Sequence, residues 1–84
     1  MKFKANVYVT LKMGVLDPQG KAVLGALKNL EFNEVNDVRV GKFIELRLDA
    51  ESEDQAEQRL WGMCEELLAN PVIEDAKLEL EEIE

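Results

Sequence analysis

Cys64 is the side chain of this sequence best suited by type to nucleophilic chemistry. A cysteine attacks as its thiolate, which a histidine commonly activates, and the sequence contains no histidine. Because Cys64 lies within an apolar pattern of helical spacing, we interpret it as a packed core thiol. A single cysteine excludes an internal disulfide and CxxC chemistry. The carboxylates, which could still bind a metal, show no metal-site spacing. We therefore predict no metal site, and we also predict no catalytic residue and no bound cofactor.

The segment Gly14–Gly20 joins a predicted strand to a predicted helix, which is where phosphate-binding loops occur. It contains neither the GxGxxG nor the GxxxxGK pattern, and Asp17 places a negative charge where an anion would bind. We therefore interpret the segment as a simple helix start. Arg39 and Lys42 place two cations around Gly41, which would suit a phosphate or an acidic partner. The simpler interpretation is a strand bend with solvated charges.

Tyr8, Phe43 and Trp61 fall outside the main apolar stripes of the sequence. Single exposed aromatic side chains are common on protein surfaces, so each could be an ordinary surface residue. If they cluster, aromatic side chains on an otherwise polar sheet face would indicate a protein–protein contact surface. The sequence leaves both interpretations open.

The first two elements follow from alternation and capping. Residues 2–11 alternate strictly, which predicts a half-buried strand with one apolar face: Phe3, Ala5, Val7, Val9 and Leu11. Asp17 as N-cap and Pro18 at the first helical position predict a helix to about Leu30. We expect its apolar stripe (Val23, Ala26, Leu27 and Leu30) to pack on the sheet. Gly20 would let the first turn approach the sheet closely.

From Val38 the apolar residues of one face keep even numbers across Gly41: Val38, Val40, Ile44, Leu46 and Leu48. A two-residue hairpin turn at Gly41–Lys42 would put Ile44 and its successors on the wrong face. Either the turn has three residues, or Val35–Asp49 is one long strand bent at Gly41. A bent strand could serve two sheets, which would require a second chain, and we favour this alternative.

The C-terminal half predicts a helix and a strand. Ser52 and Gln55 form a capping box that starts a helix ending at Asn70–Pro71. Its apolar residues recur at spacings of three and four: Ala56, Leu60, Met63, Cys64, Leu67 and Leu68. A final strand is predicted from Ile73 to Leu80. The order β-α-β-(β)-α-β indicates one α+β domain over residues 1–84, with two helices on one face of a ferredoxin-like antiparallel sheet.

The composition limits the classes of partner. The net charge of −8 argues against nucleic acid, whose binding rests on neutralising phosphates. The charge is uneven: residues 1–30 carry five lysines and one aspartate, net +4, which leaves −12 for residues 31–84. No apolar run approaches the roughly 20 residues of a membrane span, and nothing resembles a signal peptide. We expect no membrane contact and a cytoplasmic location.

Three stretches of the sequence together resemble the PurS family. The first contains Val9–Lys12 and Gly14–Gly20, followed by Ala22. The second is Val38–Lys42 with Ile44–Leu46, and the third runs from Cys64 to Glu74. The match covers essentially the whole chain in the right order. Members of this family are the small subunits of phosphoribosylformylglycinamidine synthase, a ligase of purine biosynthesis.

The resemblance implies a helper protein without catalytic residues. Such a subunit forms a dimer or higher oligomer and bridges a glutaminase and an ATP-dependent synthetase, assisting ammonia transfer. ATP and magnesium would be used by the synthetase, and this chain would bind no cofactor. On this basis we expect a partner interface formed by nine residues: Tyr8, Lys12, Gly14, Asp17, Gln19, Arg39, Lys42, Phe43 and Trp61. The alternative from another class is an ACT-like regulatory domain of similar architecture that binds a small ligand.

Overall fold

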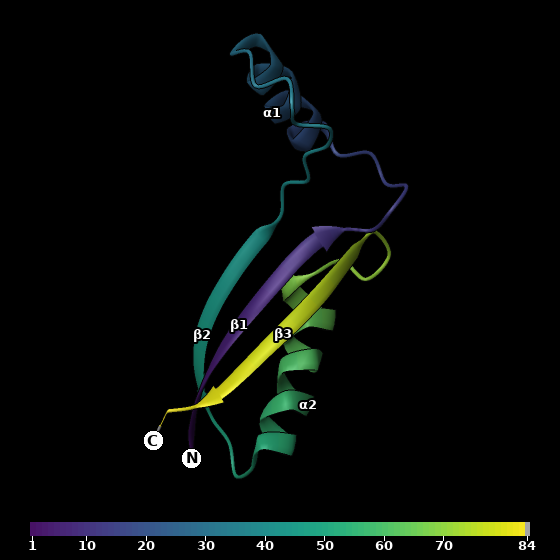
Figure 1. The fold of residues 1–84 in the computed structure, drawn as a ribbon. Coiled ribbons are helices and arrows are strands. Elements are labelled where there is room, and N and C mark those ends of the chain that lie inside the picture. The colour runs from purple at the N-terminus through teal and green to yellow at the C-terminus, as the bar shows by residue number, and fades with distance from the viewer. Residues whose placement is uncertain (84) are drawn as a thin grey trace.

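The core of the molecule is an antiparallel sheet. The structure, a computed structural model, describes residues 1–83. Within that range β1 (Lys2–Leu11), β2 (Lys42–Asp49) and β3 (Glu74–Glu82) pair in the order β2-β1-β3 (Figure 1). The strand predicted over residues 2–11 is confirmed, and its apolar face is buried at Phe3, Ala5, Val7 and Val9. β3 begins one residue later and ends two residues later than predicted.

Helix α2 (Glu53–Met63) covers one face of this sheet (Figure 1). The predicted start is confirmed, because the Ser52 hydroxyl accepts the backbone N–H of Gln55 at 3.1 Å. The helix continues as the π-helical turn η1 (Cys64–Leu68), in which the N–H of Ala69 donates to the Cys64 carbonyl at 3.0 Å. Leu60 and Cys64 are buried, as the apolar pattern predicts, and Cys64 clusters with Val7 and Val9 of β1.

Leu67 departs from the predicted apolar stripe, since 83% of it is exposed. The cause is the π turn, which places more residues in each turn than an α-helix and so rotates the residues that follow Cys64. Leu68 takes the inward position and packs against the cluster of Val7, Val9 and Cys64.

Helix α1 (Pro18–Asn29) does not lie on the sheet as the sequence indicated. Figure 1 shows it beyond the end of the sheet, to which the two connecting segments lead. Val23 is 41% exposed and Leu30 68% exposed, whereas only Leu24 and Leu27 of the helix's larger apolar side chains are half-buried in the described chain. The Cα radius of gyration, 16.4 Å, exceeds the roughly 12 Å expected of a compact domain of this length. The expected stripe is present, but residues 1–83 leave most of it uncovered.

The ends of α1 agree with the prediction. Asp17 is the N-cap and accepts the N–H of Gly20 at 2.9 Å. The helix ends in a left-handed residue, Glu31 (φ 72°), with the N–H of Phe32 donating to the Leu27 carbonyl at 3.0 Å. Gly20 does approach another segment closely, but that segment is not the sheet. A Cβ added to Gly20 would collide with the Val38 carbonyl.

The segment before β2 matches neither of the two predicted alternatives, the three-residue hairpin turn and the long bent strand. Residues 36–41 are irregular, and β2 begins at Lys42, directly after Gly41. Among residues 1–83, Val38–Val40 pairs with no strand, so the three-residue hairpin is wrong and the strand is shorter than the long bent one. Gly41 is where the chain enters the sheet, and an added Cβ there would collide with the Val9 carbonyl. The α+β class, the antiparallel sheet and the order of the elements are confirmed.

Candidate functional site

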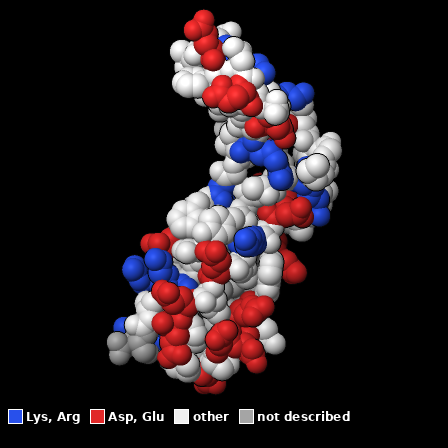
Figure 2. All heavy atoms as spheres, viewed as in Figure 1, with Lys and Arg blue, Asp and Glu red and all other residues white. Residues whose placement is uncertain are grey.

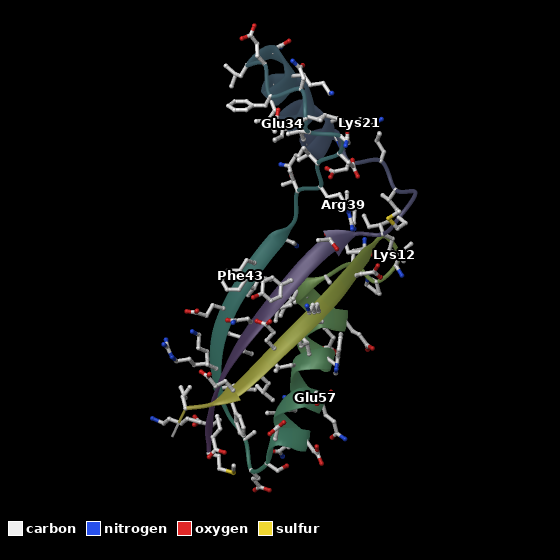
Figure 3. All side chains as sticks on the ribbon, viewed as in Figure 1. Lys12, Lys21, Glu34, Arg39, Phe43 and Glu57 are labelled. Carbon is white, nitrogen blue, oxygen red and sulfur yellow. The ribbon has the colours of Figure 1, made fainter. Side chains whose placement is uncertain are left out.

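A hollow of about 410 Å³ separates the sheet from α1, and we call it the saddle. It is lined by Leu11–Asp17, by Lys21 in the first turn of α1, and by Asp37–Arg39. Figure 3 shows Arg39 between Lys12, at the end of β1, and Lys21 on α1. Four of the nine predicted interface residues, Lys12, Gly14, Asp17 and Arg39, therefore meet here.

Asp17 fixes the geometry of the saddle. Its Oδ1 accepts the N–H of Gly20 at 2.9 Å, and its Oδ2 accepts the N–H of Val40 at 3.1 Å. These two hydrogen bonds, assisted by the positive charge of Arg39, hold the pKa of the Asp17 carboxyl below its usual range. Asp17 thus connects α1 to the segment that leads into β2, and its charge is stabilised by the fold.

Arg39 closes the saddle from the other side. Its guanidinium donates to the backbone carbonyl of Leu11, which joins the segment before β2 to the end of β1. A guanidinium has five N–H donors, so this one bond leaves most of its donor capacity available to a partner. Lys12 is held differently, through a 3.3 Å ion pair with Asp75 of β3.

The turn of Lys12–Leu16 gives the saddle its rim. Gly14 has φ +86°, a left-handed conformation that suits glycine, and the N–H of Val15 donates to the Lys12 carbonyl at 3.1 Å. Met13 and Leu16 extend from this rim into solvent, with 86% and 66% of their surfaces exposed. The rim therefore offers apolar contacts next to the cations.

A second hollow of about 370 Å³ adjoins the saddle and shares Leu11 and Asp17 with it. It is lined by Pro18 and Gln19 of α1, by Val40–Lys42, and by parts of β1 and β3. The ammonium group of Lys42 donates to the Leu68 carbonyl at the end of η1, 3.3 Å away. Gln19 and Lys42 of the predicted interface thus lie together, next to the saddle.

Tyr8 and Phe43 form an aromatic pair on the sheet face opposite α2. They are register partners on β1 and β2, with ring centroids 5.1 Å apart. The Tyr8 hydroxyl donates to Glu79 Oε1 at 2.8 Å. This bond raises the pKa of Tyr8, and it lowers the pKa of Glu79, because it stabilises the neutral phenol beside the ionised carboxylate. Figure 3 shows Phe43 on this open face.

Trp61 lies apart from the aromatic pair. It is on α2, is 41% exposed, and lines a hollow of about 270 Å³ with Lys12, Cys64 and Pro71. The structure thus brings together two of the three aromatic residues singled out by the sequence. Cys64 itself is buried at 3% exposure, and burial raises the pKa of its thiol, as expected of a packed core cysteine and not of an activated nucleophile.

Sequence reasoning missed a group of exposed apolar side chains around α1. Their exposure ranges from 41% to 86%: Met13, Leu16, Val23, Leu30 and Phe32. Val23 and Leu30 were assigned to a stripe buried on the sheet of the same chain. Periodicity shows that one face of a helix is apolar, but it does not show which residues cover that face. The sequence therefore contained the apolar stripe but could not show that it stays exposed in this chain.

The residues described contain no arrangement with obvious catalytic chemistry. In residues 1–83 no group of three or more histidine, cysteine, aspartate or glutamate side chains could hold a metal ion. No helix in that same range is long and apolar enough to cross a membrane. What the surface offers instead is a charged saddle, an aromatic pair and uncovered apolar residues, all of which suit contacts with proteins.

Comparison with known proteins gives consistent matches over nearly the full length. The family model described as PurS, phosphoribosylformylglycinamidine (FGAM) synthase, matches residues 4–82. The phosphoribosylformylglycinamidine synthase subunit PurS of Bacillus subtilis is 51% identical over 81 residues, covering 96% of this chain and 95% of the relative.

Two solved structures share the arrangement of the elements. The crystal structure of Methanocaldococcus jannaschii PurS, described as one of the subunits of formylglycinamide ribonucleotide amidotransferase, has a TM-score of 0.86 at 41% identity. It covers 98% of this chain, and this chain covers 99% of it. A chain from the structure of PurLQS from Thermotoga maritima has a TM-score of 0.88 at 32% identity, with 96% and 99% coverage.

The fold and these surfaces define a small α+β protein built for contacts with other proteins. The TM-scores of 0.86 and 0.88 show that the relatives share this fold over nearly the whole chain. With a family match over residues 4–82, the chain belongs to the PurS family.

Proposed function

We propose that this chain is a non-catalytic subunit of a phosphoribosylformylglycinamidine synthase, acting in purine biosynthesis. The observation that carries the proposal is the match to the PurS family over residues 4–82. The buried, unactivated Cys64 and the lack of histidine agree with a role in assembly. The location would be the cytoplasm.

The subunit would bridge a glutaminase and an ATP-dependent synthetase. The structure of PurLQS from Thermotoga maritima, which contains a similar chain, supports association with two other subunits. ATP and magnesium would be used by the synthetase, and this chain would bind no cofactor. Ammonia released into solvent is protonated and diluted, so holding the two active sites in one complex raises the rate through proximity.

The subunit would also associate with a second copy of itself. The support is the apolar surface around α1, where Val23, Leu30 and Phe32 remain 41% or more exposed. A helix with an uncovered apolar stripe gains free energy when another chain covers it. The segment Val38–Val40, which pairs with no strand among residues 1–83, is a further place where another chain could make contact.

The nine predicted residues would divide between the contacts of the complex. Lys12, Gly14, Asp17 and Arg39 belong to the saddle, and Gln19 and Lys42 to the adjoining hollow. Tyr8 and Phe43 would form a separate apolar contact on the open face, and Trp61 another on α2. The support is that six of the nine line the two hollows, Trp61 lines a third, and Tyr8 and Phe43 are exposed on the sheet.

Reconstitution tests the proposed function directly. The purified chain is mixed with a glutaminase and a synthetase of the same pathway, and glutamine-dependent amidine synthesis is measured with and without it. We expect the activity to require the chain and all three proteins to co-elute. Equal activity in its absence would contradict the proposal. An ACT-like regulator would instead show stabilisation of the isolated chain by a small ligand, following mass action.

A charge-reversal variant tests the interface. Changing Arg39 and Lys42 to Glu should impair assembly while the isolated subunit keeps its far-ultraviolet circular dichroism. Lys2 and Arg59, which line neither the saddle nor the adjoining hollow, provide a control with the same change of charge. Equal assembly by the two double variants would remove the saddle and the adjoining hollow from the interface.

A further inference from the structure

The saddle carries a concentration of positive charge in an acidic protein. Lys12, Lys21 and Arg39 line it, and Figure 2 shows blue side chains gathered between the two parts of the molecule, with red ones above and below. Among residues 1–83, Lys12 is in an ion pair with Asp75, whereas neither Lys21 nor Arg39 is in one. Two cations are thus available to a bound group.

The acidic side chains of the saddle are already engaged. Asp17 uses both carboxylate oxygens on backbone N–H groups, those of Gly20 and Val40. Asp37 accepts the N–H of Val38 at 3.0 Å. A carboxylate that receives backbone hydrogen bonds has its charge partly offset, so it opposes a second anion less than a free carboxylate would. The cations therefore dominate the recognition of a partner.

From this arrangement we propose that the saddle binds an acidic segment of another subunit, with its Asp or Glu carboxylates on Lys21 and Arg39. The inference rests on the proposed function, because it requires a complex with other proteins. A peptide segment suits the mixed lining better than a free phosphate does. It supplies carboxylates to the cations, backbone N–H groups to the remaining oxygen lone pairs of Asp17 and Asp37, and apolar atoms to the exposed Leu16 on the rim.

The position of Lys21 on α1 separates this partner from a second copy of the chain. At 100° per residue, Val23 and Leu27 lie about 160° and 120° around the helix from Lys21. A second copy that covers the apolar stripe would thus contact the opposite side of α1 from Lys21. A segment bound to Lys21 and the second copy would therefore not compete for the same face of α1.

The experiment compares two lysines of the same helix. Lys28 lies about 20° around α1 from Lys21 but about 10 Å farther along its axis, outside the saddle. Lys21→Glu should weaken the binding of this chain to the other subunits on the order of tenfold, as expected for reversing a charge at an interface. It should also reduce the salt dependence of that binding. Lys28→Glu should bind like the unchanged chain. Asp75→Asn should tighten binding, because it releases Lys12 from its ion pair.

Other results would contradict the saddle contact, the proposed function, or both. If the unchanged chain fails to bind the other subunits, the proposed function fails. If it binds and Lys21→Glu behaves like Lys28→Glu, the proposed function stands and the saddle contact is overturned. Loss of self-association instead of complex formation in Lys21→Glu would assign the saddle to a second copy. Stabilisation of the isolated chain by inorganic phosphate, absent in Lys21→Glu, would assign it to a small anion.

Discussion

Asp17 Oδ2 accepts the backbone N–H of Val40 at 3.1 Å, across 23 residues of sequence. The other oxygen of the same carboxylate caps α1 at Gly20, so one side chain both starts the helix and fastens it to the segment before β2. The sequence predicted one structural role for Asp17, that of N-cap, and did not predict its hydrogen bond to Val40. The second hydrogen bond ties the start of α1 to the segment that leads into β2, next to the saddle.

Replacing Asp17 by Asn should separate the two roles of this residue. Asparagine has one acceptor oxygen and caps helices as well as aspartate does, so α1 should persist while the bond to Val40 is lost. Amide hydrogen exchange should accelerate at Val40 and change little inside α1. The control Asp37→Asn removes only a bond to the next residue, Val38. Unchanged protection of Val40 in Asp17→Asn would show that the bridge does not hold α1.

Acid should release the same bridge. The folded state holds the pKa of Asp17 below its ordinary value of 3.8, so the bridge contributes in full above that value and is lost as the pH falls through the lower, folded-state pKa. In a nuclear magnetic resonance titration, the amide signals of Gly20 and Val40 should shift together with one midpoint below 3.8. Separate midpoints for the two amides would contradict a shared carboxylate.

Gly41→Ala should destabilise the fold. An added Cβ would meet the Val9 carbonyl and lie 2.9 Å from Thr10 Cγ2, so the chain could not enter the sheet along its present path. We expect the free energy of unfolding to fall by about 1–3 kcal/mol, the usual cost of overpacking. Gly25→Ala is the control, since a Cβ there meets no other atom within 4 Å. It should stabilise α1 by up to about 1 kcal/mol. Denaturant unfolding measures both variants.

Leu60 and Leu67 should respond very differently to truncation. Leu60 is fully buried, so Leu60→Ala should lower the free energy of unfolding by about 2–5 kcal/mol. Leu67 is 83% exposed after the π turn, so Leu67→Ala should change it by about 0.5 kcal/mol or less. Similar losses in the two variants, measured by urea unfolding, would show that α2 continues as a regular α-helix past Cys64.

Tyr8 should titrate above its ordinary value. The hydrogen bond to Glu79 raises the pKa of this phenol above 10.0, so the bond is present at neutral pH and is lost as the pH rises through the higher value. Tyr8 is the single tyrosine of the sequence, so tyrosinate absorbance reports it directly. Glu79→Gln removes the negative charge and should bring the midpoint down. Glu82→Gln, a change at the far end of β3, should leave it where it is.

Local patterns in the sequence were enough to predict most of the individual elements. The alternation over residues 2–11, the caps at Asp17 and Ser52, and the parity of β2 each depend on neighbours in the chain. The same patterns predicted the burial of Cys64. The exposed Leu67 was not predictable this way, because a π turn changes the number of residues per turn without altering the apolar spacing.

The sequence by itself determined which residues form strands and helices, which faces are apolar, and that catalytic equipment such as histidine is lacking. Only the tertiary structure decided that α1 stands away from the sheet, that Asp17 reaches Val40, and that Lys12, Lys21 and Arg39 share a hollow. The physical reason is that periodicity reports the apolar face of an element, whereas the chain that covers this face is chosen by contacts between residues distant in sequence. In this protein some of those contacts would come from other chains.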